Sequence, residues 1–489
     1  MKKTAKRTLA IVLAIMTFIS CFGMSVSAET TEFEPLRINC TMYGDSQTQR
    51  GFTWYTAGDC DAIIEYVEAA LFDANFTNGV MKRASNDEFE GYYCHKIVLD
   101  DLKPGTTYYY RVGSKREGVW SDIGKFVTDN GDGAFSFLAI TDVQASSLEN
   151  FQQAALVMDQ AMAMNPNAEF VVNLGDFVND CTNEEWNWYG ETFGRANTNL
   201  TLVPVAGNHE GNITNKFNIG WFDSMFNLLP GEGATNGVNG TYYSYDYGNA
   251  HFCVVNSNDM YPMSQVQRNW IINDLTTSDA HWKFLLLHRA AYSAGKNINK
   301  PDTLAMRETI IEIVDQTGVD VVLSGHDHMY FRTKQVAGDA VCDTTYVTEY
   351  YNGEQITFAK EPDGAVYILP STAGTKRYSV NENAIDPINE CADVKLSTSD
   401  MGGCFANIVV DGNKLVYKAY VVNDETQEVT HIDTYAIMKD VADGAKDSYL
   451  PTDPIGTIDG FMFNISEFFT LIITYVTKLI PQLIGGLFA

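Results

Sequence analysis

Five apolar runs in this chain end directly on side chains of the kinds that bind metal ions. Each run is typical of a buried β-strand, and the motifs follow in this order: Ile-Thr-Asp142, Asn-Leu-Gly-Asp176, Val-Ala-Gly-Asn208-His209, Leu-Leu-Leu-His288 and Leu-Ser-Gly-His326-Asp-His328. Because the carboxyl ends of strands in α/β sheets converge on one crevice, these side chains could meet despite their wide spacing. Their joint occurrence predicts a metal site.

A glycine stands directly before Asp176, before Asn208 and before His326, where it permits a tight turn and a close approach of the backbone. The 33 basic and 62 acidic residues give a formal net charge of −29, which repels nucleic acid and anionic lipid. We therefore expect no nucleic-acid partner. An anionic substrate would need local positive charge, which bound metal ions supply.

Predicted strands and helices alternate around these motifs. The strands fall at residues 134–141, 170–174, 202–206, 252–255, 283–287 and 319–323. Ser146-Ser-Leu-Glu149 offers a capping box for a helix whose apolar residues recur from Phe151 to Met164. Buried strands that alternate with helices indicate a layered α/β or α+β fold.

A smaller β domain is predicted at residues 33–129, ahead of the turn-rich joint Asp129-Asn-Gly-Asp-Gly133. The stretch from Leu102 to Gly113, together with Trp120 and residues 124–128, resembles the last strands of a fibronectin type III sandwich. In such a sandwich Tyr108 or Tyr110 could anchor the corner. No group of catalytic residues is visible in this domain.

The motifs taken together resemble the pattern D…GD…GNH[DE]…H…GHxH of the calcineurin-like metallophosphoesterase superfamily. With the fibronectin-like front domain, residues 33–435 are similar to purple acid phosphatase-like enzymes. The resemblance implies an α+β chain: an N-terminal β-sandwich (fibronectin III-like), then a four-layer α/β/β/α metallophosphoesterase domain at residues 133–438. It also implies two metal ions that share one carboxylate.

The resemblance gives each motif a role. Asp176 would bridge both ions, Asp142 and His328 would complete the first site, and the second site would be formed by Asn208, His288 and His326. An anionic bridge holds two cations close enough to share a hydroxide, and imidazoles complete the coordination without excess charge. The two ions would neutralise the phosphoryl oxygens while hydroxide attacks in line.

His209 would be catalytic and not a ligand in this scheme. It would donate a hydrogen bond to the phosphoryl group or protonate the leaving alkoxide. Glu210 could orient His209 or could be a solvated carboxylate. We expect His251 to support a core strand. Arg289 and Arg332 lie close to ligand motifs and could contact phosphate, although ion pairing within the fold is the stronger interpretation.

Two positions depart from the family pattern. Purple enzymes carry a tyrosine where this chain has Asn179, and many non-purple relatives carry a histidine where it has Gln144. Either side chain could offer a neutral oxygen to the first ion or to the substrate. Without a phenolate ligand, ferric iron is less favoured than divalent Mn, Zn or Fe. We expect a colourless protein whose activity peaks near neutral or alkaline pH.

The favoured function is therefore a secreted dinuclear-metal phosphomonoesterase that hydrolyses small phosphate esters by metal-activated hydroxide. A phosphodiesterase or nucleotidase that uses the same ions is the alternative, and a non-catalytic cell-surface binding protein is a weaker one. The loops that shape the pocket would decide between the first two. Residues 339–363 and 380–401 are predicted to be loop insertions of this kind.

The two ends of the chain carry their own signals. Residues 1–28 are typical of a signal peptide, with a membrane anchor as the alternative, so we expect a secreted or cell-surface protein. Residues 440–460 are predicted to be a linker, and residues 461–489 an amphipathic helix. This helix could lie on a membrane surface, dock on a protein domain or span the bilayer. Eight cysteines remain after signal removal, so disulfides are permitted, although Cys253 is predicted to be a buried thiol.

Overall fold

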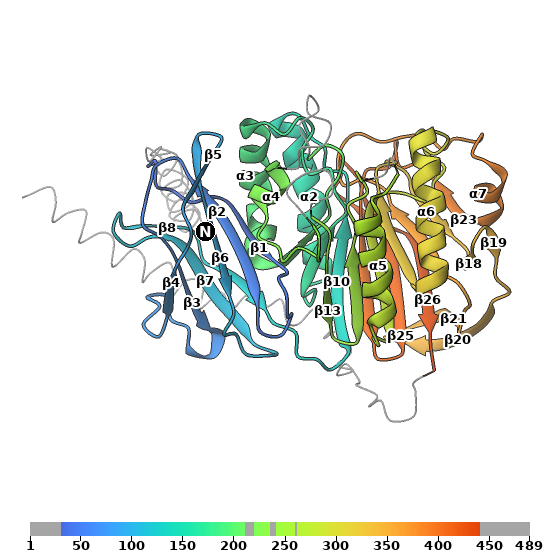
Figure 1. Cartoon of the computed structure of the whole chain (residues 1–489), viewed down its shortest axis with the longest axis horizontal. Helices are drawn as coiled ribbons and strands as arrows, with labels where there is room; N and C mark the ends of the chain where they lie inside the picture. The colour runs from blue at the N-terminus through green and yellow to red at the C-terminus, as the bar shows by residue number, and fades with distance from the viewer. Residues whose placement is uncertain (1–30, 211–219, 235–240, 260–261, 441–489) are drawn as a thin grey trace, which may run out of the picture.

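The computed structural model describes residues 31–210, 220–234, 241–259 and 262–440. The predicted signal peptide, the predicted C-terminal helix and all but the first residue of the predicted linker lie outside these ranges. A small β-sandwich lies beside a larger sandwich that helices cover on both faces (Figure 1). Over the described part of the chain, no helix is long and apolar enough to cross a membrane.

A twelve-stranded sheet runs through the whole molecule. In spatial order its strands are β20 (Thr345–Tyr351), β21 (Glu354–Lys360), β26 (Val429–Met438), β25 (Lys414–Val422), β24 (Gly403–Asp411), β10 (Ala134–Ile140), β11 (Phe170–Asn173), β12 (Thr201–Pro204), β1 (Leu36–Thr41), β2 (Arg50–Thr56), β6 (Tyr92–Leu99) and β5 (Asp87–Phe89). Strands β10, β11 and β12 are parallel, so their carboxyl ends lie at one edge.

A seven-stranded sheet packs face to face on the central part of the large sheet. Its strands are β13 (Tyr243–Tyr247), β14 (Ala250–Val254), β15 (Trp282–Arg289), β16 (Val321–Gly325), β22 (Val366–Pro370), β17 (Tyr330–Thr333) and β23 (Ala392–Leu396). The rings of Phe137 in β10 and Phe252 in β14 lie 5.5 Å apart in the core between the sheets. Aromatic and branched residues on the inner faces therefore join the two sheets.

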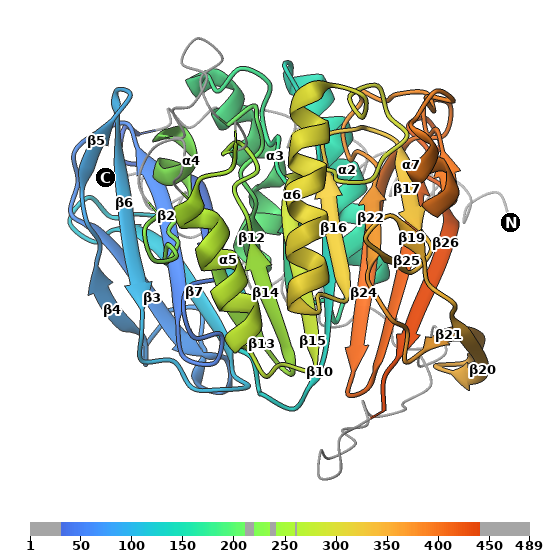
Figure 2. The same ribbon diagram turned by 45° about the vertical axis from the view of Figure 1, so that its right-hand side comes forward.

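Helices cover both outer faces of this pair of sheets. Helices α2 (Leu148–Met164) and α3 (Asn183–Asn199) pack on the large sheet, and α5 (Gln265–Thr277) and α6 (Pro301–Thr317) pack on the seven-stranded sheet (Figure 2). Short helices α4 (Gly220–Met225) and α7 (Asp386–Cys391) complete these layers. The predicted four-layer α/β/β/α arrangement is confirmed.

The N-terminal sandwich joins part of the large sheet to a separate small sheet. The small sheet consists of β4 (Val80–Arg83), β3 (Ala62–Glu68), β7 (Thr107–Ser114), β8 (Val119–Trp120) and β9 (Gly124–Val127), and a 3₁₀ turn, η1 (Ala69–Leu71), follows β3. Tyr108 is the corner residue, because its hydroxyl accepts a 2.9 Å hydrogen bond from the Lys103 amide. The Tyr110 hydroxyl is buried without a partner among the described residues.

The two domains share a sheet across their boundary. Strand β1 of the N-terminal sandwich pairs in parallel with β12 of the larger domain, with Thr41 opposite Leu202. Fully buried Arg50 fixes this joint: its guanidinium donates to the Thr201 hydroxyl at 3.1 Å and to the Ser46 and Val127 carbonyl oxygens at 2.7 Å. The domains therefore form one continuous structure.

Three sequence predictions are wrong in detail. The segment 339–363 is not a loop: it contains the hairpin β20–β21, which extends the large sheet, and β19 (Ala340–Val341), which pairs with β18 (Val336–Ala337). The segment 380–401 likewise contains α7 and β23. The β-branched and aromatic residues of β20, Thr-Tyr-Val-Thr-Glu-Tyr-Tyr, favour a strand. The cap of α2 is Ser147, one residue later than predicted.

All eight described cysteines are unpaired in the structure. Cys253 is fully buried in β14, and burial raises the pKa of its thiol well above the usual range. The prediction of a buried thiol at this position is confirmed.

Candidate metal centre

The six predicted ligands lie at one end of the larger domain, and they come from both of its sheets. Asp142, Asp176 and Asn208 follow β10, β11 and β12 of the large sheet. The remaining three come from the seven-stranded sheet, where His288 is near the end of β15 and His326 and His328 follow β16. The metal centre thus lies where the carboxyl ends of two packed sheets meet, whereas a simple α/β crevice uses one sheet.

Two ligand groups share one carboxylate. Asp176, His288 and His326 bring ligand atoms within 4.8 Å of one another, and so do Asp142, Asp176 and His328. The Nε2 atom of His288 lies 3.1 Å from Asp176 Oδ2, and Nε2 of His328 lies 3.2 Å from Asp142 Oδ1. Asp176 is therefore the only member common to both groups, as a bridging ligand must be.

Several atoms of this cluster that could bind a metal ion are buried and have no hydrogen-bond partner among the described residues. They are Asp142 Oδ1, Asn208 Oδ1 and His288 Nε2. Burying such atoms without a partner costs free energy. Two carboxylates, an amide oxygen and three imidazoles match the ligand preferences of divalent transition ions, so these residues fit a dinuclear centre.

Hydrogen bonds set the orientation of two imidazoles. His288 Nδ1 lies 2.8 Å from the Leu174 carbonyl oxygen, and His328 Nδ1 contacts the Lys376 carbonyl oxygen. A carbonyl only accepts, so each Nδ1 carries the proton and each Nε2 offers a lone pair to the centre. The fold thereby selects the tautomer that can bind an ion.

The backbone at three ligand motifs takes an uncommon conformation. The φ angles are +54° at Asp142, +55° at Asp176 and +76° at His326, all in the left-handed region. Gly207 is packed so tightly that a Cβ atom there would lie 2.2 Å from the Asp176 amide nitrogen. Strain of this kind persists only where surrounding structure enforces it, and it is common at functional sites.

Glu210 is fully buried and holds the first turns of two motifs together. Its carboxylate accepts hydrogen bonds from the amides of Asp176 at 2.9 Å, Phe177 at 2.8 Å and Gly207 at 2.8 Å. Burial raises the pKa of Glu210 to about 8, and the negative charge of Asp176 adds to this. It is neither a solvated carboxylate nor a direct partner of the His209 ring, so both sequence interpretations of Glu210 are wrong.

The charged groups of the cluster shift one another's pKa values. Burial would raise the pKa of Asp176, but the neighbouring imidazoles of His288 and His209 outweigh it and hold this pKa far below its usual range. Burial would lower the pKa of His288, but the carboxylate of Asp176 raises it to about 9. Burial lowers the pKa of His326 well below its usual value, and the charges of His288 and Arg289 act in the same direction. Asp176 is therefore anionic and His326 neutral.

His209 lies beside this cluster together with both residues that depart from the family pattern. Its Nδ1 donates to the Asn179 carbonyl oxygen, and its Nε2 lies 2.5 Å from Gln144 Nε2. The Gln144 amide nitrogen is also 3.4 Å from Asn179 Oδ1. Gln144 Oε1 is buried without a partner in the described chain, so of these two residues Gln144 is the one with an oxygen to offer.

Other residues near the centre carry no motif of their own. Asp327, between two predicted ligands, is buried and accepts hydrogen bonds from the Ser293 hydroxyl at 2.9 Å and the Asn297 amide at 3.1 Å. Tyr378 stacks on the His328 ring with centroids 4.5 Å apart. Only the position of Asp327 inside His-Asp-His signalled a role in the sequence.

The two arginines near ligand motifs differ in their contacts. Arg332 is buried and bound to Asp433 at 2.6 Å and Asp393 at 2.7 Å, so it is an ion-pair partner within the fold. Arg289 Nη1 lies 3.2 Å from His326 Nε2 and places positive charge beside the centre.

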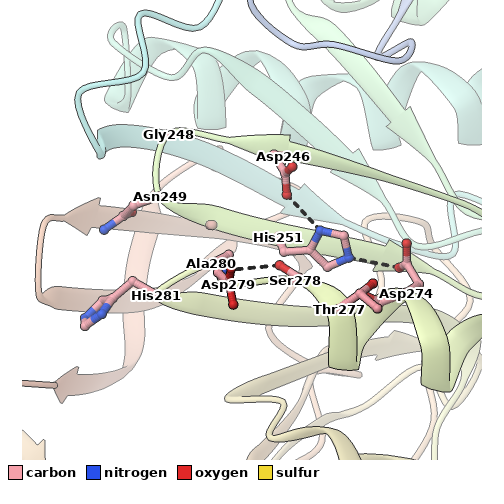
Figure 3. A pocket seen from close by; sticks show the side chains of 11 residues that line it. Asp246, Gly248, Asn249, His251, Asp274, Thr277, Ser278, Asp279, Ala280 and His281 are labelled. Carbon is pink, nitrogen blue, oxygen red and sulfur yellow. Dashed lines mark hydrogen bonds and ion pairs between the residues drawn. The ribbon is translucent and has the colours of Figure 1, made fainter. Parts of the chain in front are cut away.

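A pocket of about 660 Å³ lies at the opposite end of the seven-stranded sheet. His251 in this pocket is held between Asp246 at 2.8 Å and Asp274 at 2.9 Å (Figure 3). Both ring nitrogens are used in these contacts, so His251 ties β13, β14 and α5 together. The expected structural role of His251 agrees with this geometry.

Comparisons with known proteins match both domains. The calcineurin-like phosphoesterase family model matches residues 135–330, and the purple acid phosphatase N-terminal domain model matches residues 35–128. Purple acid phosphatase 15 of Arabidopsis thaliana is 24% identical over 368 residues, which cover 69% of this chain and 62% of that protein. Acid phosphatase type 7 of Danio rerio is 23% identical over 68% of this chain and 77% of its own length. The chain thus spans less than two thirds of the Arabidopsis relative.

Two solved structures share the fold. The purple acid phosphatase PPD1 from yellow lupin (Lupinus luteus) seeds superimposes with a TM-score of 0.66 and 16% identity, covering 83% of this chain and 75% of that one. The structure of PhoD gives a TM-score of 0.59 with 14% identity over 84% of this chain and 92% of that one. With both matched domains in the order that the fold shows, the chain consists of a purple acid phosphatase N-terminal domain followed by a calcineurin-like phosphoesterase domain.

Proposed function

We propose that this protein is a dinuclear-metal phosphomonoesterase that releases phosphate from small phosphate esters. The observation that carries the proposal is the pair of ligand groups that share Asp176. The proposed ligands are the six predicted from the sequence: Asp142, Asp176, Asn208, His288, His326 and His328. Family membership supports a phosphoester hydrolase.

Two divalent ions at this position would neutralise the phosphoryl oxygens and acidify water into a nucleophile. The protein residues fix where this occurs. His288 and His328 present Nε2 because their Nδ1 protons are bound to backbone carbonyls. Asn208 contributes a neutral oxygen, so its site keeps the net positive charge that attracts phosphate.

His209 is the proposed general acid. Its Nδ1 proton is held by the Asn179 carbonyl, which leaves Nε2 as the atom that can exchange a proton with the substrate. Gln144 contacts this Nε2. A half-turn of the Gln144 amide exchanges its oxygen for its nitrogen, so the same side chain can serve the neutral and the protonated ring.

A comparison of two esters tests the reaction class. The purified, metal-loaded protein should hydrolyse p-nitrophenyl phosphate with a higher kcat/KM than bis-p-nitrophenyl phosphate. The reverse preference would identify the alternative, a phosphodiesterase. Activity on neither ester, in a folded protein that holds two ions, would support the non-catalytic binding protein instead.

Ligand variants test the site. Asp176→Ala and Asn208→Ala should abolish turnover and lower the metal content, while far-ultraviolet circular dichroism stays unchanged. Asp279→Ala is the control, because Asp279 is exposed at the opposite end of the sheet. Unchanged turnover in Asp176→Ala would contradict the proposed mechanism.

We propose that the ions are divalent, because Asn179 replaces the tyrosine that gives purple enzymes their colour. Elemental analysis should find two ions per chain, and the absorption spectrum should show no charge-transfer band in the visible range. The pH–rate profile should peak at or above neutral pH. A coloured protein with an acidic optimum would argue for ferric iron.

Export is proposed from residues 1–28, which resemble a signal peptide. Mass spectrometry of the protein from its native host should find a mature N-terminus at Glu29. A chain that retains Met1 or Lys2 would contradict cleavage.

A further inference from the structure

Two loops lie beside the candidate metal centre, residues 290–300 and residues 371–385. Hydrogen bonds hold these loops to each other and to the motif that follows β16. Asp327 holds the first loop through Ser293 and Asn297. A Cβ atom at Gly295 would lie 2.4 Å from Asp327 Cγ, so the backbone of this loop packs directly against the Asp327 side chain. In the second loop, the Asn381 amide donates to the Ala294 carbonyl at 2.6 Å. The backbone positions from which the side chains of both loops extend are therefore fixed.

A lysine, a tyrosine and a ligand histidine are stacked at this junction. The Tyr378 ring lies against His328 with an interplanar angle of 15°, and Lys296 Nζ lies 3.9 Å from the centroid of the same tyrosine ring. The Tyr378 amide also donates to the His328 carbonyl at 2.9 Å. A cation–π contact of this kind holds the Lys296 ammonium one aromatic ring away from a ligand of the first ion.

A second lysine reaches the same region. The Lys376 carbonyl accepts the proton of His328 Nδ1, so the Lys376 backbone contacts a predicted ligand of the first ion, and the Lys376 side chain is exposed. The next residue, Arg377, is bound to Asp424 at 2.5 Å and is not available. Within the described ranges neither Lys296 nor Lys376 forms an ion pair.

The charge of Lys376 acts on the Lys296 ammonium. Burial lowers the pKa of Lys296, and the positive charges of Lys376 and Lys300 lower it further. In a chain of net charge −29, these two exposed lysines place positive charge beside the candidate centre, where it would attract an anionic group of a substrate.

We propose that Lys296 and Lys376 form a subsite for a second phosphate group on the substrate, separated from the scissile phosphate by the width of the Tyr378 ring. The preferred substrates would be bisphosphorylated small molecules. Tyr378 serves as a positioning residue, because it holds Lys296 and stacks on His328. This inference rests on the proposed phosphatase function.

Calorimetry with ligands that cannot be hydrolysed tests the subsite directly. Hexane bisphosphonate and hexylphosphonate differ by one phosphonate group. The metal-loaded wild type should bind the bisphosphonate more tightly by about tenfold, because two lysines add charge-assisted hydrogen bonds. The Lys296→Ala/Lys376→Ala double variant should bind both ligands equally. Lys115→Ala, an exposed lysine of the N-terminal domain, is the matched control and should keep the wild-type ratio.

Steady-state kinetics separate this inference from the function on which it rests. Wild-type protein should show a higher kcat/KM for fructose bisphosphate than for fructose monophosphate, and the double variant should lose that preference while it retains its rate on p-nitrophenyl phosphate. Lys296→Arg should keep part of the preference. Equal binding of both phosphonates by an active wild type would overturn the subsite alone. A loaded protein that hydrolyses no ester would overturn the phosphatase proposal, and the calorimetric ratio would still decide whether the subsite exists.

Discussion

At the scale of residues, two side chains beside the ligands act through different physics. Glu210 accepts hydrogen bonds from three backbone amides and is fully buried, so it determines the shape of the turns before Asp176 and Asn208. His209 is only partly buried, and its Nδ1 is linked to the Asn179 carbonyl, which leaves Nε2 for the substrate in the proposed mechanism. We therefore expect the first residue to govern stability and the second to govern rate.

Glu210→Gln should destabilise the fold. The variant keeps the size of the side chain but turns an NH₂ group towards amides that need an acceptor. Leaving one buried donor unpaired costs about 1–3 kcal/mol. Urea unfolding of the loaded protein should show this decrease in the free energy of unfolding. A free energy of unfolding equal to that of the wild type would mean that the Glu210 carboxyl oxygens are not needed as acceptors for these amides.

His209→Ala should lower kcat by about a hundredfold to ten-thousandfold, the usual contribution of a general acid. The loss should be greater for an alkyl phosphate than for p-nitrophenyl phosphate, whose leaving group needs no proton. Two ions should remain bound, as measured by elemental analysis. His431→Ala, an exposed histidine of β26, is the control. An equal loss on both esters would show that His209 stabilises the phosphoryl group instead of the leaving group.

At the scale of elements, the two ends of the seven-stranded sheet have different tasks. The carboxyl ends of β15 and β16 carry the proposed ligands, whereas the amino end of β14 carries the ion-paired His251. Burial would lower the pKa of His251, but hydrogen bonds to Asp246 and Asp274 raise it to about 9 from 6.5. The stabilisation is complete below pH 6.5 and disappears as the pH rises through 9.

His251→Gln should therefore remove a pH-dependent part of the stability. The wild type should have the higher free energy of unfolding, and its advantage over the variant should be about 2 kcal/mol larger at pH 6 than at pH 10. This value is reduced because Asp246 is exposed and solvent screens its charge. Urea titrations across this range provide the measurement, and His431→Gln should show no such trend. A difference independent of pH would mean that the histidine is neutral in the fold.

At the scale of the whole molecule, the shared sheet makes the two domains one unit of stability. The pairing of β1 with β12 and the buried Arg50 both cross the boundary. Helix α3 also contacts β1, where Arg37 donates to Asn187 at 2.9 Å and lies over the Tyr92 ring. Neither sandwich can open without exposing the edge of the other.

Thermal unfolding should accordingly follow a single transition in scanning calorimetry. Arg50→Met should lower its midpoint without splitting it, because three oxygen acceptors on both sides of the boundary lose their donor. The surface variant Lys115→Ala should leave the midpoint unchanged. Two separate transitions in the wild type would show that the domains are independent.

The sequence by itself determined which residues could form the centre and which strands lead to them. Apolar runs that end on Asp142, Asp176 or His288 are local patterns, because burial on both faces of a strand fixes its composition. The departures at Gln144 and Asn179 were visible in the same way. These statements need no knowledge of which strands are neighbours.

Only the tertiary structure decided how these residues meet. The ligands come from two sheets that pack face to face, and no local pattern records which sheet a strand joins. The roles of Glu210, Asp327 and Tyr378 depend on contacts between segments far apart in the chain. The same holds for the hairpin β20–β21 and for the sheet that crosses the domain boundary. Such contacts are set by long-range packing, whose free energy depends on the whole fold.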